Sequence, residues 1–132
     1  MKETVIIRSR SRVEMIDVTT EIQKVVDRSG IRDGICVIFV PHTTAALTIN
    51  ENADPDVRKD IVAHLSEMIP RRHSFRHAEG NSDAHIKAGL TGSSETLLVE
   101  EGKLDFGTWQ SIFFCEFDGP RNRRCLVKVI GE

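Results

Sequence analysis

The sequence has no tyrosine, one tryptophan and only three cysteines in 132 residues, and it contains no long apolar run. Its apolar runs stay well short of the roughly 18 residues that mark a membrane-spanning helix, so we expect no membrane partner. Residues 1–10 alternate apolar and charged side chains and lack the apolar stretch of a secretory signal. Cys36, Cys115 and Cys125 form no CxxC pair, and their odd number predicts reduced thiols in the cytoplasm.

An excess of charge of one sign is also missing. Lys and Arg number 18 against 20 Asp and Glu, which gives a net charge of −2. This balance offers no electrostatic support for nucleic-acid binding. The hydrophobic content of 39% and the charged content of 29% are ordinary for a globular protein. The length suits one domain with a real core, so we expect a single domain over 1–132.

Hydrophobic periodicity predicts a mixed order of strands and helices. We expect strands over 3–12, 13–18, 35–40, 96–100, 104–106, 110–117 and 124–130. Residues 35–40 are apolar on both faces, which indicates a central strand covered on both sides. Asp33 and Gly34 before it carry a turn signal. This order predicts an α+β fold whose sheet is covered by helices on one side.

Three helices are expected, each from a different start signal. Thr20 with Gln23 indicates a capping box, and Asp54 followed by Pro55 indicates a second helix. That second helix carries an apolar stripe that should hold it in place: Val57, Ile61, Leu65 and Met68. Residues 70–81 are polar and predict an exposed loop. A short helix should follow from Asn81 or Ser82, broken by Gly89 and Gly92.

Two segments, 42–52 and 77–85, hold three of the five histidines next to carboxylates, amides and hydroxyls. His42 follows the strand over 35–40. His77 and His85 bracket a loop and a helix start, and we expect the loop to fold back so that their imidazoles meet. His64 and His73 are assigned to solvent, although the choice between His73 and His77 as the site histidine stays open.

Imidazoles and carboxylates suit two kinds of chemistry. They are ligands for a catalytic divalent metal, and they are acid/base groups near neutral pH. Three histidines that leave a coordination position open are typical of a zinc-like centre. Asp83 and Glu79 could orient such ligands. The sequence leaves open whether the histidines are metal ligands or acid/base groups.

The remaining polar candidates lie late in the chain. Trp109 is either a core residue or a platform for an aromatic ligand, with Gln110 beside it. Glu116 and Asp118 could hold magnesium, but we favour their neutralising the arginines of the same hairpin. Arg121 is the candidate for a bidentate phosphate contact.

Three blocks in this order resemble one known family. They are HTTAALTINENADP over 42–55, AHIK over 84–87 and GTWQ over 107–110, and they resemble the YjbQ-like proteins, also called the secondary thiamine-phosphate synthase family. The resemblance implies a small α+β fold, a β-sandwich with helices against one sheet. It also implies a homotrimer, with a pocket around the histidines between subunits.

The resemblance also implies a site and an activity. His42, His77 and His85 carry over as the site, with Glu51 and Asn52 as polar support. The reaction would join a hydroxymethylpyrimidine diphosphate to a thiazole phosphate and release pyrophosphate, as a weak or secondary activity. Thr43, Thr44, Asn52, Trp109, Gln110 and Arg121 are the expected contacts to this phosphorylated small molecule.

Two further functions remain open from the sequence. The protein could be a metal-dependent hydrolase that uses metal-bound water, with Glu51 or Asp83 as general base. It could also be a trimer that binds a metal or a small molecule without turnover. The expected cofactor is a divalent metal, either zinc-like at the histidines or magnesium carried by the substrate diphosphate.

Overall fold

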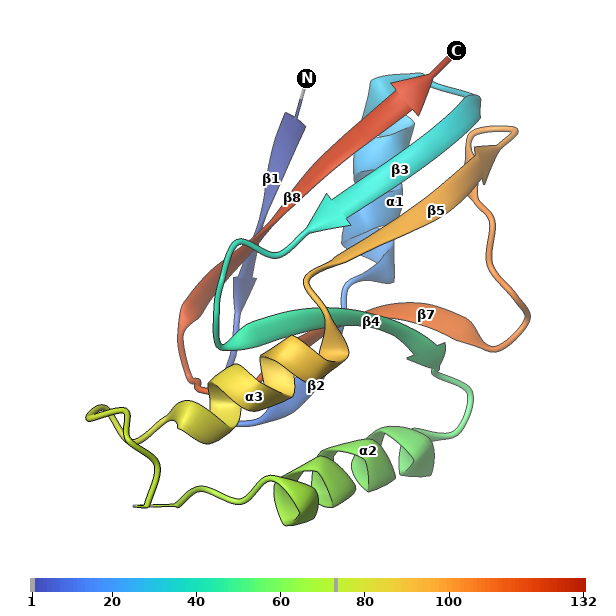
Figure 1. Ribbon diagram of the computed structural model, residues 1–132. Coiled ribbons are helices and arrows are strands. Elements are labelled where there is room, and N and C mark those ends of the chain that lie inside the picture. The colour runs from blue at the N-terminus through green and yellow to red at the C-terminus, as the bar shows by residue number, and fades with distance from the viewer. Residues whose placement is uncertain (1, 73) are drawn as a thin grey trace.

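The computed structural model describes residues 2–72 and 74–132, and this part of the chain forms eight strands and three helices (Figure 1). His73, one of the histidines considered above, lies outside the described residues. The elements in chain order are β1 (Lys2–Arg8), β2 (Glu14–Asp17), α1 (Thr19–Ser29), β3 (Asp33–Phe39), β4 (Ala45–Glu51), α2 (Pro55–Met68), α3 (Ser82–Thr91), β5 (Ser94–Glu100), β6 (Lys103–Leu104), β7 (Gln110–Glu116) and β8 (Asn122–Gly131).

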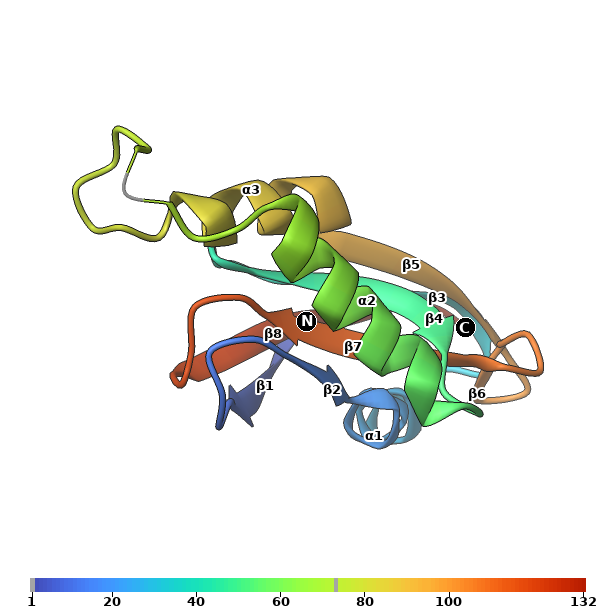
Figure 2. The same cartoon turned by 90° about the horizontal axis from the view of Figure 1, so that it is seen from below.

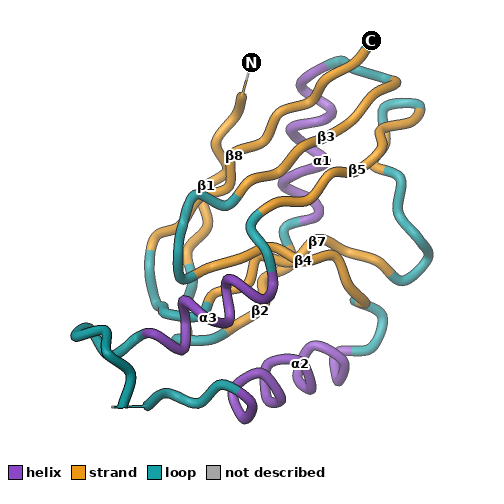
Figure 3. The backbone as a smooth tube through the Cα atoms, viewed as in Figure 1, coloured by secondary structure: helices purple, strands orange, loops and turns teal. Residues whose placement is uncertain are grey.

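The described strands form two antiparallel sheets. One has five strands in the order β1-β8-β3-β5-β6, and the other has three in the order β2-β7-β4. The chain passes repeatedly from one sheet to the other, and the two sets of strands run in different directions (Figure 3). The link between β3 and β4, residues 40–44, is one of these passages. It brings the strand before His42 and the strand after it into different sheets.

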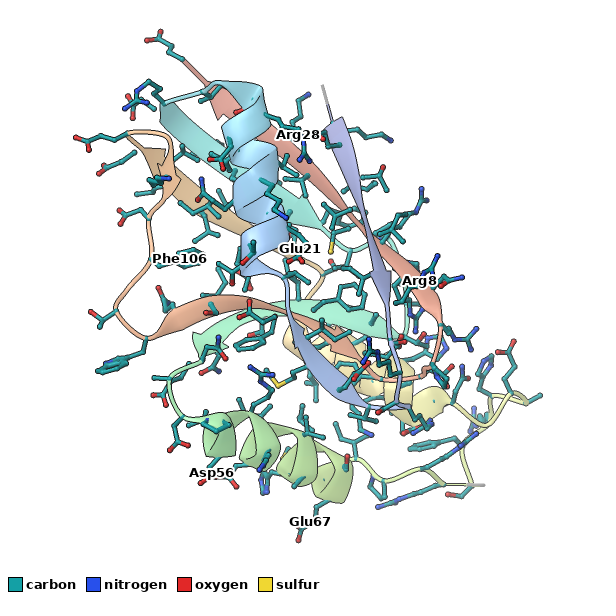
Figure 4. All side chains as sticks on the ribbon, turned by 180° about the vertical axis from the view of Figure 1, so that it is seen from behind. Arg8, Glu21, Arg28, Asp56, Glu67 and Phe106 are labelled. Atoms are coloured by element: carbon teal, nitrogen blue, oxygen red, sulfur yellow. The ribbon has the colours of Figure 1, made fainter. Side chains whose placement is uncertain are left out.

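The first core lies between the two sheets. Alternate residues of β3, β5 and β8 point into it from one side, and β4 and β7 supply the other side. Helix α1 closes this core with Ile22, which is fully buried. Arg28 of α1 (Figure 4) also forms an ion pair with Glu3 of β1 at 2.9 Å. Each fully buried aliphatic or aromatic side chain here contributes about 1.5–3 kcal/mol.

The second core lies on the other face of the three-stranded sheet. Figure 1 shows α2 and α3 below the three-stranded sheet and α1 above it, and Figure 2, seen from below, shows α2 in front of β4 and β7. Phe113 and Phe117 are buried there against Ala84 and Ala88 of α3. The predicted sandwich with helices covering one sheet is thereby confirmed. None of the described helices is long and apolar enough to span a membrane.

Helix α2 begins as expected but packs less tightly than its stripe predicts. Asp54 caps it by accepting a hydrogen bond from the Asp56 N–H at 2.9 Å, and Pro55 occupies the first turn. None of its residues is fully buried, however, and Met68 is 55% exposed. Ile61 and Leu65 of the predicted stripe nevertheless pack, partly buried, against the second core, so the stripe holds α2 as expected except at Met68.

The outer face of the five-stranded sheet carries apolar side chains among charged ones such as Arg124 and Lys128, and no described helix or strand of the single chain covers it. We call it the open sheet face, and its apolar members are Ile6, Ile35, Val37, Phe39, Leu98, Leu126 and Ile130. Phe39 is 44% exposed, Leu98 is 56% and Ile130 is 49%. The prediction that β3 is covered on both faces is therefore wrong for one chain. Its second apolar face is this open surface.

Several local predictions differ from the structure. The sequence did not predict β4, because its first residues, Ala45 and Ala46, show no alternation of apolar and polar side chains. Gly34, assigned to a turn, pairs within β3. Helix α3 continues through Gly89, since one internal glycine costs a helix only about 1 kcal/mol.

The capping box predicted at the start of α1 is also absent. The helix starts at Thr19, and Val18 is the N-cap residue without a side-chain cap bond. Gln23 instead donates to the Gly102 carbonyl at 3.0 Å and accepts from the Leu104 N–H at 3.0 Å. This side chain therefore fixes the β5–β6 turn against α1, a contact 81 residues away in sequence.

Gly34 lies where β3 and β8 approach each other closely, and Gly89 of α3 offers a contrasting open position. A Cβ at Gly34 would lie 2.0 Å from the Ile130 carbonyl oxygen, whereas a Cβ at Gly89 meets nothing within 4 Å. We expect Gly34→Ala to lower the free energy of unfolding by about 1–3 kcal/mol through overpacking. Gly89→Ala should raise it by about 0.5–1 kcal/mol because alanine favours the helix. Urea unfolding at equal protein concentration measures both, and equal effects would contradict the register.

Candidate functional site

A cavity of about 680 Å³ opens where three irregular segments meet. These are the β3–β4 link, the loop that leads into α3, and the turn between β7 and β8. We call it the histidine cavity. Its lining residues are Phe39, Val40, Pro41, His42, Thr43, Thr44, His77, Glu79, Asn81, His85, Ser93, Arg121 and Arg123. The structure thus brings together all three predicted histidines with Thr43, Thr44 and Arg121.

His42 is held by a backbone group of β8. The N–H of Arg124 donates to His42 Nε2 at 3.1 Å. Because Nε2 accepts this hydrogen bond, the proton of the neutral ring lies on Nδ1. Burial lowers the pKa of His42, and the positive charges of Arg123 and Arg124 lower it further. The imidazole is therefore a neutral ring that offers an Nδ1–H donor.

His77 and His85 meet as the sequence predicts. Their ring centroids lie 5.3 Å apart with the planes at 90°, an edge-to-face arrangement. His85 lies in the first turn of α3, whose N-cap residue is Asn81, and His77 lies on the loop before it. His77 Nε2 is 3.9 Å from a carboxylate oxygen of Glu79. His42 and His85 also share a neighbouring hollow of about 330 Å³. His64 is exposed on α2, as predicted.

The floor of the cavity is a buried network centred on Glu116. Arg123 Nε donates to Glu116 Oε1 at 2.9 Å, and Ser9 Oγ donates to the same oxygen at 2.6 Å. The Asp118 N–H donates to Oε2 at 3.1 Å. Burial by itself raises the pKa of Glu116, but these hydrogen bonds outweigh it and the net pKa is lowered. Glu116 is therefore an ionised partner of Arg123.

Asp118 organises the other side of the same turn. It accepts from Asn81 Nδ2 at 2.8 Å and from Arg121 Nη2 at 2.9 Å. Burial opposes ionisation of Asp118, but these two donors hold its pKa below the usual range. The prediction that Glu116 and Asp118 neutralise the arginines of their hairpin, in preference to holding magnesium, agrees with these contacts.

Arg123 is the cavity residue that the sequence analysis did not single out for binding. It is 6% exposed, and it lies on β8 in line with the inward-facing Cys125 and Val127. Its Nη2 donates to Thr44 Oγ1 at 2.8 Å. The sequence did carry a signal for Arg123, because it lies on the apolar face of an alternating strand. A buried arginine at such a position needs a buried partner.

Asp83, predicted as a catalytic residue, lies under α3 and does not line the histidine cavity. Its carboxylate accepts two hydrogen bonds from Arg12, at 3.0 and 3.1 Å, and one from Lys87 at 3.1 Å. Burial raises its pKa, but the two cations outweigh burial and the net pKa is lowered. Asp83 is thus committed to a structural ion cluster, with little capacity left as a general base.

The other predicted residues gather at the far end of β4. Glu51 pairs with Gln110 across the β4–β7 ladder, and the Asn52 N–H donates to the Trp109 carbonyl at 2.9 Å. A seven-residue strand is about 20 Å long, so within one chain this group lies well apart from His42. Trp109 is 63% exposed, which rules out the core interpretation. We call Glu51, Asn52, Trp109 and Gln110 the far-end cluster.

The donor set does not fit a three-histidine metal centre. Within residues 2–72 and 74–132, no three His, Cys, Asp or Glu side chains are grouped closely enough to hold a metal ion. His42 already uses its Nε2 lone pair on the Arg124 N–H, so a metal at that nitrogen would break this bond. We therefore derive no step through a metal bound by the histidines.

The whole chain matches one family model. The model, described as UPF0047 protein YjbQ-like, covers residues 3–132. The chain belongs to the YjbQ-like family. The blocks over 42–55, 84–87 and 107–110 predicted this family, and the match confirms it.

YjbQ-like relatives agree over nearly their full length. A UPF0047 protein of Methanocaldococcus jannaschii is 54% identical over 126 residues, which are 96% of this chain and 91% of that protein. YugU of Bacillus subtilis is 49% identical, with 99% of this chain and 100% of YugU covered.

Solved structures of the YjbQ-like family share the fold. One from Clostridium acetobutylicum has a TM-score of 0.94 and 51% identity, with 97% of this chain and 99% of that chain covered. Another, from Sulfolobus solfataricus, has a TM-score of 0.94 and 36% identity, with 100% and 97% covered. The latter is described as a YbjQ-like protein of unknown function. The family match gives the fold and names no reaction.

The neutral state of His42 can be tested by titration. We expect its pKa in the folded protein to lie below the ordinary 6.5, and to return toward 6.5 in urea. The stability that neutral His42 contributes is full above pH 6.5 and is lost as the pH falls through the folded pKa. Nitrogen-15 NMR of the imidazole measures the pKa and the tautomer. A folded pKa at or above 6.5, or a proton on Nε2, would contradict the geometry.

Proposed function

We propose that the histidine cavity binds a phosphorylated small molecule and that the protein is a transferase of the thiamine-phosphate-synthase type. The observation that supports this most is the meeting of three histidines with Arg121, Thr43 and Thr44 in one cavity. Its volume, about 680 Å³, is in the range of ligand pockets. Imidazole, guanidinium and hydroxyl groups together suit phosphate oxygens.

The proposed reaction balances without a base. The bond between the pyrimidine methylene carbon and the diphosphate oxygen breaks, and both electrons leave with pyrophosphate. The lone pair of the thiazole nitrogen forms the new carbon–nitrogen bond, so no proton must be removed. Charge develops on the leaving oxygen, and the site must stabilise that charge.

The three histidines and Arg121 each have a role in this proposal. His42 donates its Nδ1–H to the leaving oxygen, as a neutral imidazole suited to polarising an oxygen. His77 and His85, adjacent at the mouth, supply further hydrogen bonds or a proton to pyrophosphate. Arg121, half exposed, attracts the terminal phosphate. Magnesium, a hard ion that prefers oxygen ligands, would neutralise diphosphate charge when it is bound with the substrate.

Activity of His42 variants tests the transferase. With both precursors and magnesium, wild type should form thiamine phosphate. His42→Ala should lower kcat/KM by about 10²–10³-fold, the usual effect of removing one preorganised donor. His42→Asn keeps an N–H near the Nδ1 position and should lose less. His64→Ala, on the exposed side of α2, is the matched control and should act as wild type. Absence of product from wild type would refute the transferase.

We also propose that the protein assembles as a homotrimer whose neighbouring copies cover the open sheet face. Several large apolar side chains exposed on one sheet face indicate a protein interface. Phe39 belongs both to this face and to the histidine cavity. A copy seated on the face would therefore border the cavity, and it could bring its own far-end cluster to it. The three free, buried cysteines agree with the proposed cytoplasmic location.

Light scattering tests the assembly with two variants of matched exposure. Wild type should have about three times the 14.8 kDa mass of the chain. Leu98→Glu, at a 56% exposed position of the open sheet face, should give monomers because it buries a charge at the interface. Met68→Glu, at a 55% exposed position of α2, should keep the wild-type mass. A monomeric wild type, or dissociation by Met68→Glu alone, would refute this interface.

A further inference from the structure

Arg123 has one hydrogen-bonding group left over. Its Nε and Nη2 donate to Glu116 and Thr44, and Nη1 has no protein partner among the described residues. Nη1 is also not among the fully buried unpartnered atoms of that part of the chain, so it keeps some accessible surface, and Arg123 is one of the residues that line the histidine cavity. Arg123, whose side chain is only 6% exposed, thus keeps one guanidinium nitrogen free of protein partners in a residue that lines the histidine cavity.

Arg121 is less suited to hold an anion firmly. Its side chain is 52% exposed, and both Nε and Nη2 already donate to Asp118, at 2.8 and 2.9 Å. A long exposed side chain also loses rotamer freedom when it binds. Arg123 has lost that freedom already, because Glu116 and Thr44 hold two of its three nitrogens. Preorganised donors bind an anion without this cost.

From this geometry we infer that Arg123 is the fixed phosphate-binding residue of the cavity, and that Glu116 and Ser9 are its positioning residues. The ligand group is a phosphate oxygen, either of a phosphate monoester or of pyrophosphate. Nη1 of Arg123 would bind it, and Thr43 lines the same cavity. This inference rests on the proposed phosphorylated ligand but not on the transfer step.

The charge balance of the cavity floor refines the expected ligand. Glu116 compensates Arg123, and Asp118 compensates Arg121, so the two ion pairs add no net charge. Binding should then depend on directed hydrogen bonds more than on long-range attraction. We therefore expect the site to select tetrahedral phosphate over a singly charged carboxylate such as acetate, and to weaken only modestly with added salt.

The test measures phosphate binding directly, without turnover. Inorganic phosphate, pyrophosphate and acetate are titrated by calorimetry into wild type, Arg123→Lys and Arg8→Gln, with the assembly state checked. Arg123→Lys keeps the charge but has one nitrogen in place of three, so it cannot hold Glu116 and Thr44 and still bind phosphate, and its phosphate affinity should fall at least tenfold. Arg8→Gln, an exposed arginine of β1 outside the cavity lining, should change the affinity less than twofold.

Two further variants complete the test. One removes the charge of Arg123 without leaving a buried unpaired carboxylate, and the other tests whether Ser9 positions Arg123. Because Arg123→Gln alone would leave Glu116 unpaired, the neutral pair Arg123→Gln with Glu116→Gln is used, and it should fold but not bind phosphate. Ser9→Ala should keep the fold and weaken phosphate binding severalfold. In wild type the nitrogen-15 resonances of the Arg123 guanidinium should shift when phosphate is added. In Ser9→Ala the same resonances should already be broadened in the absence of phosphate.

The outcomes distinguish this inference from the proposed function. Phosphate binding that depends on Arg123, in a protein that makes no thiamine phosphate, would keep the phosphate site and refute the transferase. Wild-type affinity in Arg123→Lys and in the neutral pair, together with loss in Arg121→Gln, would refute the role of Arg123. Equal affinity for acetate and phosphate would refute the phosphate selectivity.

Discussion

The ion pair between Glu116 and Arg123 fixes the end of the molecule on which the site depends. Glu116 belongs to β7 of the three-stranded sheet, and Arg123 belongs to β8 of the five-stranded sheet. Both side chains are almost fully buried, and Ser9 joins them from the end of β1. Removing one partner of a buried pair costs about 3–5 kcal/mol, because the other charge stays uncompensated. The pair therefore ties β7 to β8 at the place where the two sheets meet.

The histidine cavity follows from that junction. Where the sheets are joined, the chain crosses between them through residues 40–44, and the β7–β8 turn lies beside this crossing. Strand β3 pairs with β8 only as far as Leu126, and beyond that point the Arg124 N–H finds its acceptor in His42. The same contact that satisfies the backbone also sets the tautomer of the imidazole. The hydrogen bond from Arg124 to His42 therefore serves both the backbone of β8 and the protonation of the imidazole.

The sequence predicted the elements whose signals are local. The start of α2 follows from Asp54 and Pro55, and the meeting of His77 with His85 follows from a helix start placed between them. The family blocks gave the fold class, which the two sheets and three helices confirm. Strand β4 was missed because its burial on both faces comes from two cores that the sequence alone does not show.

The far-end cluster illustrates why grouping by sequence proximity fails for strands. Glu51 and Asn52 are near His42 in sequence, and a helix or loop there would keep them close. An extended strand instead carries them about 20 Å away, at roughly 3.3 Å for each residue. Within a single chain, Glu51 and Asn52 therefore do not lie beside His42. They would support a His42 side chain only in the proposed trimer, where it belongs to a neighbouring copy.

By itself the sequence determined which segments carry the histidines, where the helices over 55–68 and 82–91 begin, and the family. These depend on signals within a few residues of each other. Only the tertiary structure decided that Arg123 lies at the cavity floor, that Asp83 is held by Arg12 and Lys87, and which nitrogen of His42 bears the proton. Those outcomes depend on contacts such as Ser9 with Glu116, 107 residues apart, and His42 with Arg124, 82 apart. No local pattern specifies such pairs, because they form only when the two sheets are packed together.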